Sequence, residues 1–178
     1  MTSREIVRRV VRHQEPPRIA WDFLDPAYRD IQGASPIRLI NEAAEPFLEF
    51  GDYEHLKKKA NFHGEVRMDA YGNIYGRLNG KTKGECVLGA LEEGWESLDR
   101  FEFPTVDMAH VEQVKGWNLK DSDKYTLTYL PPGVFSTLRD LRKMDNALMD
   151  TAAEPEMVEA YMEKFTPFVV NMVHLAAD

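Results

Sequence analysis

The chain has 178 residues, which suits one domain, and 43% of them are hydrophobic, enough to form a core. Its 22 basic and 30 acidic residues give a net charge of −8, and no basic stretch is interleaved with aromatic residues, so nucleic acid is not expected as a partner. The single cysteine, Cys86, excludes an internal disulfide and a multi-cysteine zinc site. Because the sequence contains neither an apolar run of membrane-spanning length nor the apolar core of a signal peptide, we expect a cytoplasmic protein that does not associate with membranes.

The N-terminal segment has the pattern of a capped helix. Thr2 and Glu5 stand at the spacing of a capping box, which predicts a helix over residues 2–13. Apolar residues form one face of this helix, and most of its arginines lie elsewhere on it. These arginines are consistent either with a surface that binds an anion or a partner, or with a solubilising helix face; they are Arg4, Arg8, Arg9 and Arg12.

A short apolar segment follows the Pro16-Pro17 pair. The sequence RIAWDF at 18–23 is apolar except for Asp22, which predicts a first, mostly buried strand. A carboxylate near the carboxyl end of such a strand is a candidate site residue. Asp22, or Asp25 just before a proline, is equally well explained as a helix cap.

The next region changes from irregular helix to hairpins. Residues 26–62 look helical but irregular, with a helix start at Ser35-Pro36 and an interruption at Glu45-Pro46. Residues 65–91 are rich in glycine, tyrosine and turn dipeptides, and Asn79-Gly80 is a strong hairpin signal, so we expect a small β-meander there.

Four side chains of this meander region are singled out by their chemistry. Asp69, Tyr71 and Tyr75 could line a cleft, although alternating aromatic residues on a hairpin are more often packing residues. Cys86 has no histidine near it in the sequence, which indicates a buried, unreactive thiol.

The second half of the chain alternates helices with one strand–turn–helix unit. We expect short helices at 95–100 and 106–115, the latter ended by Gly116. Residues 125–130 predict a strand, and a proline-proline-glycine turn leads to a helix with an apolar stripe over 135–148. In α/β proteins the site usually lies at such a turn. A last helix should begin at 154–155, and Pro167 should kink or divide it.

In this order the segments resemble the N-terminal half of the uroporphyrinogen decarboxylase superfamily, and more closely its methyltransferase-like branch. The resemblance is carried by MTSREIVRRVVR at 1–12, EPPRIAWDF at 15–23, DAYGNIYGRL at 69–78, LEEGWESLDRFEFP at 91–104 and FSTLRDLRKMDNALMDTAAEPEMVEAYMEKF at 135–165. It implies an α/β fold, an incomplete (β/α)8 TIM barrel with an inserted β-hairpin or meander near 65–91. Residues 1–178 would be the N-terminal part of that single barrel domain, which implies either a truncated or split reading frame or pairing with another chain.

The resemblance also implies a chemistry. The relatives are corrinoid- or thiol-linked methyltransferases that act on small methylated substrates, with a zinc ion held by one His and two Cys in the C-terminal half. This chain shows no H-x-C spacing, so we expect neither zinc nor corrinoid in it and no metal ligands. Its catalytic residues remain unknown. The residues expected to form the wall of the substrate cleft, by binding and orienting a small molecule, are Trp21, Asp22, Asp69 and Tyr71.

Two other functions remain open. The acidic composition and an apolar helix stripe at 157–175 suggest a non-catalytic α/β subunit that completes or scaffolds a barrel, with a complementary chain or a second copy as partner. A carboxy-lyase of porphyrin biosynthesis is the third reading. Such decarboxylases carry an R-Q-A-G-R segment that binds substrate carboxylates, whereas the matching stretch here, DFLDPAYR at 22–29, retains only Arg29. This difference argues against porphyrinogen decarboxylation.

Overall fold

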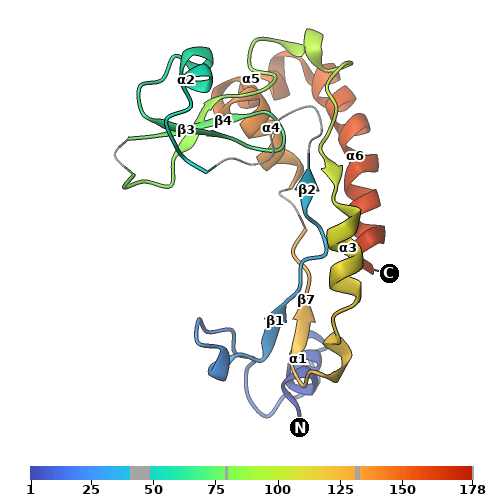
Figure 1. The fold of residues 1–178 in the computed structure, drawn as a ribbon. Helices are drawn as coiled ribbons and strands as arrows, with labels where there is room; N and C mark the ends of the chain where they lie inside the picture. Colours follow the sequence, from blue (N-terminus) through green and yellow to red (C-terminus); the bar gives the residue numbers. More distant parts are fainter. Residues whose placement is uncertain (41–48, 79, 131–132, 178) are drawn as a thin grey trace. The chain divides into compact units, whose positions relative to one another are not determined.

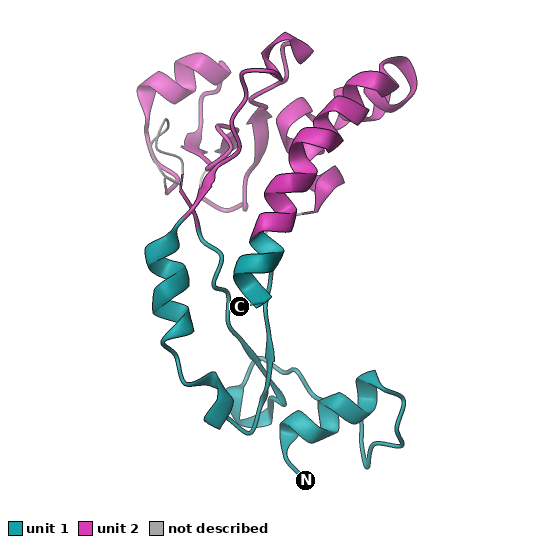
Figure 2. Cartoon of the chain, turned by 90° about the vertical axis from the view of Figure 1, so that its right-hand side faces the viewer, with its two compact units in different colours: residues 1–38, 107–131, 172–178 teal, residues 39–106, 132–171 magenta. Residues whose placement is uncertain are grey.

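The computed structural model describes residues 1–40, 49–78, 80–130 and 133–177, which form a mixed α/β structure without a closed barrel. The chain divides into two compact units: unit 1 comprises residues 1–38, 107–131 and 172–178, and unit 2 comprises residues 39–106 and 132–171 (Figure 2). The elements follow in the order α1 (Ser3–Val11), η1 (Pro26–Tyr28), β1 (Ile31–Gly33), β2 (Leu39–Ile40), α2 (Glu54–Ala60), β3 (Glu65–Met68), β4 (Ile74–Arg77), β5 (Glu85–Leu88), η2 (Trp95–Ser97), β6 (Thr105–Val106), α3 (Met108–Lys115), η3 (Leu119–Asp121), β7 (Tyr125–Leu127), α4 (Val134–Arg142), α5 (Met144–Ala153) and α6 (Pro155–Ala177) (Figure 1).

Unit 1 is built on a parallel pair of strands. β1 pairs with β7, with Ile31 opposite Tyr125 and Gly33 opposite Leu127, and α1 packs against both strands. The predicted capping box of α1 is confirmed: Glu5 N–H donates to Thr2 Oγ1 at 3.2 Å, and Thr2 N–H donates to the Glu5 carboxylate at 2.8 Å. The strand predicted over residues 125–130 is confirmed only in its first half, as β7, and residues 128–130 are not in a strand.

The buried strand predicted at residues 18–23 is wrong. Only an isolated antiparallel bridge between Asp22 and Arg29 forms there, and the side chains of Ile19 and Phe23 are 73% and 55% exposed. The segment folds back on itself because Asp30, which is buried, accepts a hydrogen bond from Trp21 N–H at 2.8 Å. The sheet strand is instead β1, which begins directly after Asp30.

Within the described part of residues 26–62, the predicted irregular helix is confirmed only at η1 and α2. Ser35 starts no helix, because its hydroxyl donates to backbone oxygens, at 3.3 Å to Ile37 and 3.1 Å to Tyr129, and the chain continues extended into β2. Asp25 accepts from Ala27 N–H at 2.9 Å and caps η1, as the capping alternative predicted. The interruption predicted at 45–46 lies outside the described residues.

Unit 2 contains the predicted β-meander. β3, β4 and β5 form an antiparallel sheet in that order, with a register shift between Ile74 and Tyr75. Asn79 of the predicted turn lies outside the described residues. The connection between β4 and β5 is longer than a two-residue turn, because Gly76 pairs with Glu85.

Aromatic side chains form the core of unit 2. Phe103 stacks on Phe168 with ring centroids 5.1 Å apart, and Tyr161 stacks on Phe165 at 5.4 Å. Tyr161 and Phe165 are 0% and 1% exposed, so this part of the apolar stripe of α6 is used within the chain and does not require a partner. α6 is continuous through Pro167, so of the two predicted effects of this proline the division of the helix is wrong, and the kink stays a prediction.

The single helix predicted over 135–148 is broken in the structure. α4 ends at Arg142 and α5 begins at Met144, with Lys143 between them at a positive φ of 66°. The Lys143 ammonium donates to the backbone oxygen of Cys86 at 2.6 Å, which holds the break against β5. Gly133 caps α4 with φ −66°, so the turn does not use the left-handed conformation that its glycine allows.

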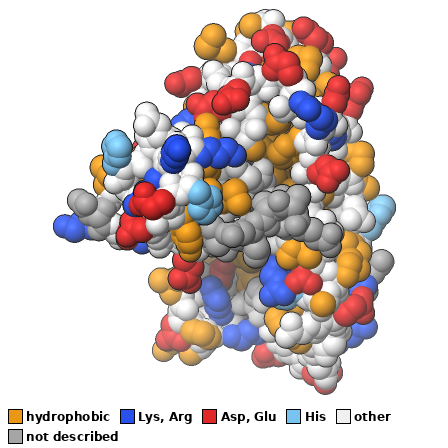
Figure 3. Space-filling view, turned by 45° about the horizontal axis from the view of Figure 1, so that its top comes forward, with side chains coloured by type: hydrophobic (Ala, Val, Ile, Leu, Met, Phe, Trp, Pro, Cys, Tyr) orange, Lys and Arg blue, Asp and Glu red, His pale blue; other side chains and the backbone are white. Residues whose placement is uncertain are grey.

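The described surface carries both signs of charge. On the face drawn in Figure 3, acidic and basic side chains are interspersed with apolar ones. Among the described residues, no helix is both long enough and apolar enough to cross a membrane.

Candidate functional site

A polar cluster in unit 2 joins the meander to α4. Tyr75 Oη donates to Asp140 Oδ2 at 2.9 Å, and Arg139 Nε donates to Asp140 Oδ1 at 2.8 Å. The thiol of Cys86 donates to the backbone oxygen of Asp140 at 3.3 Å. We call Tyr75, Cys86, Arg139 and Asp140 the Asp140 cluster.

The sheet register brings the members of this cluster together. Tyr75 on β4 and Cys86 on β5 are directly paired, and opposite residues of an antiparallel pair project to the same face of the sheet. α4 supplies Arg139 and Asp140 near its C-terminal end. Tyr75 and Asp140 are 65 residues apart in the sequence, so only the tertiary structure joins them.

Asp69 organises the turn that leads into β4. Its Oδ1 accepts from the backbone N–H groups of Tyr71 and Asn73, both at 2.9 Å, and its Oδ2 accepts from the Asn73 side chain at 3.0 Å. This is an Asx-type turn, in which the carboxylate replaces a backbone acceptor. Burial raises the pKa of Asp69, and the hydrogen bonds from Asn73 and Tyr71 oppose that rise.

Tyr71 lies in the aromatic core of unit 2. The residue is 8% exposed, and its ring meets Phe168 edge-on with centroids 6.4 Å apart. Burial raises the pKa of the Tyr71 phenol, the negative charge of Asp69 adds to the rise, and a hydrogen bond with Thr137 opposes it. Tyr71 is therefore a packing residue, which is the alternative that the sequence predicted for the aromatic residues of the hairpin.

Tyr75 and Cys86, two members of the Asp140 cluster, are held in their protonated forms. Burial raises the pKa of Tyr75, and the charges of Asp69 and Asp140 add to the rise. Burial raises the pKa of the Cys86 thiol to about 12. At neutral pH the cluster therefore presents a phenol and a guanidinium as hydrogen-bond donors and contains no thiolate nucleophile, in agreement with the expected unreactive cysteine.

Trp21 and Asp22 belong to unit 1. Asp22 Oδ1 lies 3.0 Å from Arg29 Nε in an ion pair. Trp21 is 38% exposed, and the guanidinium carbon of Arg18 lies 4.4 Å from the centroid of its ring. The structure thus brings Trp21 together with Asp22 in unit 1, and Asp69 together with Tyr71 in unit 2.

Sequence reasoning missed Asp140 and Arg139 as site residues. Asp140 lies within an amphipathic helix, and its place in the sequence gives no local signal of a partner on a distant strand. Asp30, a buried carboxylate in the same unit as the predicted Asp22, was also missed, because no local pattern marks its pairing with Arg18.

The residues present do not fit the zinc site that the family resemblance implies elsewhere. The implied site uses one His and two Cys, whereas this chain has one thiol, that of Cys86, which donates to the backbone oxygen of Asp140. Within the described ranges, no group of three or more His, Cys, Asp or Glu side chains is arranged to hold a metal ion. Comparisons of the chain with protein-family models, with curated proteins and with solved structures found no match.

Proposed function

We propose that the chain supplies the first strands of a (β/α)8 barrel of the uroporphyrinogen decarboxylase type. In this proposal it contributes a substrate-binding wall to a methyltransferase that transfers a methyl group from a small methylated compound to a corrinoid or a thiol. The observation that carries the proposal is the hydrogen bond between Tyr75 and Asp140. It joins residues 69–78 to residues 135–165, two of the segments on which the resemblance rests.

The sheet of unit 1 supports the same proposal. β1 and β7 are parallel and are separated by a long connection, as neighbouring strands of a barrel are. α4 is the next element after β7 in the chain. A strand followed by a helix is the repeating order of a (β/α)8 fold.

The chemistry of the Asp140 cluster suits binding and orientation. A protonated Tyr75 and the guanidinium of Arg139 donate hydrogen bonds to the oxygens of Asp140, which leaves a lone pair of Tyr75 Oη and the other N–H groups of Arg139 for the polar atoms of a small substrate. Holding a substrate in one orientation lowers the barrier of a later step. We assign no bond-breaking step to these residues, because the cluster contains no activated nucleophile.

Nuclear magnetic resonance of the isotope-labelled chain tests this proposal. The chain is titrated with methanol, methylamine and dimethyl sulfide, and separately with a porphyrin octacarboxylate. Saturable binding of a methylated compound should shift backbone signals at 69–78 and 135–142. Tyr75→Phe should weaken that binding, whereas Tyr129→Phe, at a position 60% exposed in unit 1, should not.

Two results count against the proposal. If no methylated compound binds at millimolar concentration, or if the shifts fall outside both segments, the substrate wall is wrongly placed. If the porphyrin alone binds and shifts signals around Arg29, the carboxy-lyase alternative is favoured. Arg29 is already paired with Asp22, which makes it a weaker ligand for substrate carboxylates.

A non-catalytic subunit that completes or scaffolds a barrel is the second candidate. Two parallel strands make a marginal sheet by themselves, and within the described residues β1 and β7 have only each other as partners. Exposed apolar side chains also gather in the segment before β1: Ile19, Trp21, Phe23, Leu24 and Tyr28. Size-exclusion chromatography with light scattering tests this candidate, since a well-behaved monomer at high concentration contradicts it.

A further inference from the structure

A cavity of about 530 Å³ in unit 1 lies between α1 and residues 119–126. Arg8, Arg12 and Lys120, which line it, are exposed basic residues, and no acidic side chain is among the described residues that form its wall. The cavity is distinct from the Asp140 cluster, which belongs to unit 2.

Arg4 fixes the shape of this cavity. Its guanidinium donates to the backbone oxygens of Leu119 and Lys120 at 3.1 Å and of Lys124 at 3.2 Å. The Arg4 N–H also donates to the backbone oxygen of Asp123 at 2.7 Å. Because Arg4 is used in this way, residues 119–124 are held against α1 and the cavity is formed before any ligand arrives.

Arg8 and Arg12 follow Arg4 at intervals of four residues, which places the three side chains along one side of α1 and its C-terminal cap. Within the part of the chain that the structure describes, no ion pair joins Arg8, Arg12 or Lys120 to a carboxylate. Like charges at this spacing repel one another, so a bound anion would stabilise the arrangement.

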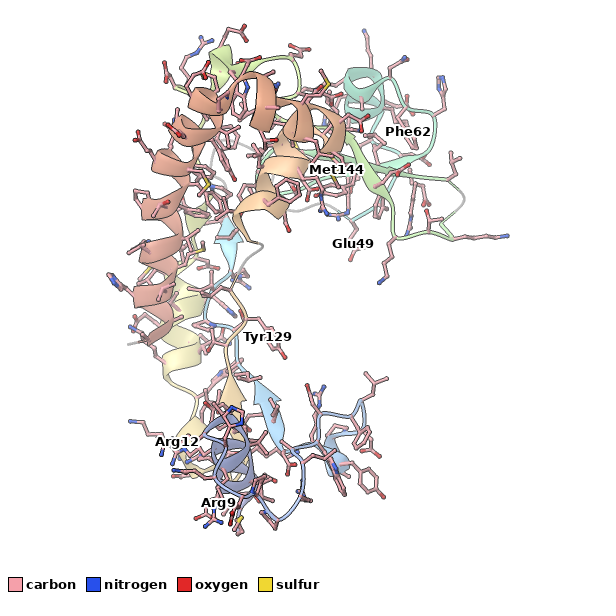
Figure 4. The ribbon with its side chains drawn as sticks, turned by 180° about the vertical axis from the view of Figure 1, so that it is seen from behind. Arg9, Arg12, Glu49, Phe62, Tyr129 and Met144 are labelled. Carbon is pink, nitrogen blue, oxygen red and sulfur yellow. The ribbon has the colours of Figure 1, made fainter. Side chains whose placement is uncertain are left out.

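Arg9 provides an internal comparison. It is exposed on the same helix but does not line the cavity. Figure 4 labels Arg9 and Arg12, whose side chains both project away from α1 and its C-terminal cap. A non-specific attraction of anions to a basic helix would depend on Arg9 as much as on Arg8 and Arg12. Binding in the cavity would depend on Arg8 and Arg12 and not on Arg9.

We propose that this cavity binds a small phosphate monoester that carries an apolar or aromatic body. Guanidinium groups bind phosphate oxygens through paired hydrogen bonds, and two arginines with one lysine supply more than enough positive charge for a phosphate dianion. Val11, Leu119 and Tyr125 supply an apolar wall for the body of the ligand. The volume lies in the range of small-molecule sites, and the chain's net charge of −8 disfavours a long polyanion such as nucleic acid.

The hydroxyl of Thr126, also in the wall, is an additional donor. Its Oγ1 accepts a hydrogen bond from Gln32 Nε2 at 2.9 Å. The oxygen of the same side-chain amide, Gln32 Oε1, accepts a hydrogen bond from the Ser122 hydroxyl at 2.9 Å. This network orients Thr126 Oγ1 as an acceptor and leaves its own proton for a ligand oxygen.

Isothermal titration calorimetry of the full chain with phenyl phosphate at low ionic strength tests the proposal. Arg8→Gln and Arg12→Gln should each weaken binding by about tenfold or more, because each removes charge-assisted hydrogen bonds. Arg9→Gln should leave the affinity unchanged. All three positions are exposed, and circular dichroism confirms that the variants remain folded.

Three further ligands separate the possible sources of the anion. Inorganic phosphate should bind more weakly than phenyl phosphate, because it cannot contact the apolar wall. Tighter binding of citrate would overturn the phosphate assignment in favour of a polycarboxylate, and tighter binding of a short DNA duplex would overturn the small-molecule assignment. The site itself is refuted if phenyl phosphate does not bind at millimolar concentration, or if Arg9→Gln weakens binding as much as Arg8→Gln does.

Discussion

Arg142 and Asp150 form a buried ion pair across the junction of α4 and α5, with Nε 2.7 Å from Oδ2 and both side chains 7% exposed. Arg142 also donates to the backbone oxygens of Leu91 and Glu92, and its guanidinium carbon lies 4.7 Å from the centroid of the Trp95 ring. One side chain thus ties the segment after β5 to both helices.

Removing one partner of this pair should destabilise unit 2 strongly. Asp150→Ala leaves a buried, unpaired guanidinium, and the expected loss in the free energy of unfolding is about 3–5 kcal/mol. The double variant Arg142→Met with Asp150→Leu should lose less than Asp150→Ala alone, because no charge remains buried. Urea denaturation followed by circular dichroism measures both, and a loss well under about 1 kcal/mol for Asp150→Ala would contradict the described geometry.

The hydrogen bond between Tyr75 and Asp140 should have a measurable, smaller effect. Tyr75→Phe keeps the ring and removes the donor, which should lower the free energy of unfolding by about 1 kcal/mol. In an Asp140→Asn background the same substitution should cost less, since the charged acceptor is already gone. A double-mutant cycle measures this coupling, and strict additivity of the two effects would show that the side chains do not interact in solution.

Gly89 and Gly133 offer a matched pair of glycine substitutions. A Cβ added at Gly89 would lie 2.2 Å from the backbone oxygen of Leu141, whereas one added at Gly133 would meet nothing within 4 Å. Gly89→Ala should therefore lower the free energy of unfolding by about 1–3 kcal/mol, because backbone cannot move aside as a side chain can. Gly133→Ala should change it by no more than about 0.5 kcal/mol. Equal effects in thermal denaturation would mean that β5 does not approach α4 this closely.

Asp30 should make stability depend on pH in the acidic range. Hydrogen bonds from Arg18 and from Trp21 N–H hold the pKa of Asp30 far below its ordinary value of about 3.9, against the opposing effect of burial. Because the folded-state pKa is lowered, this stabilisation is complete above the unfolded-state pKa and is lost as the pH falls below about 5. Asp30→Asn should be less stable at neutral pH and should lose less stability on acidification, as measured by urea midpoints between neutral and acidic pH. A pH profile parallel to that of the wild type would rule out this role.

Cys86 should react slowly with thiol reagents in the folded protein. With its pKa raised to about 12, only a very small fraction is thiolate at pH 8. Labelling with a chromogenic disulfide should be about a hundredfold or more slower than in urea-unfolded chain, where the pKa is ordinary. Labelling at similar rates in both states would mean that Cys86 is neither buried nor bonded to Asp140.

Sequence alone determined the features that depend on neighbours three or four residues apart. The capping box of Thr2 and Glu5, the end of α3 at Gly116, the start of α6 at Pro155 and the antiparallel meander all follow from local hydrogen bonding and turn chemistry. Only the tertiary structure decided the exposure of residues 18–23, the break at Lys143, the Asp140 cluster and the cavity beside α1. Those features depend on contacts between residues that are far apart in the sequence, such as Arg4 and Leu119, which are separated by 115 positions. No local sequence pattern predicts such contacts.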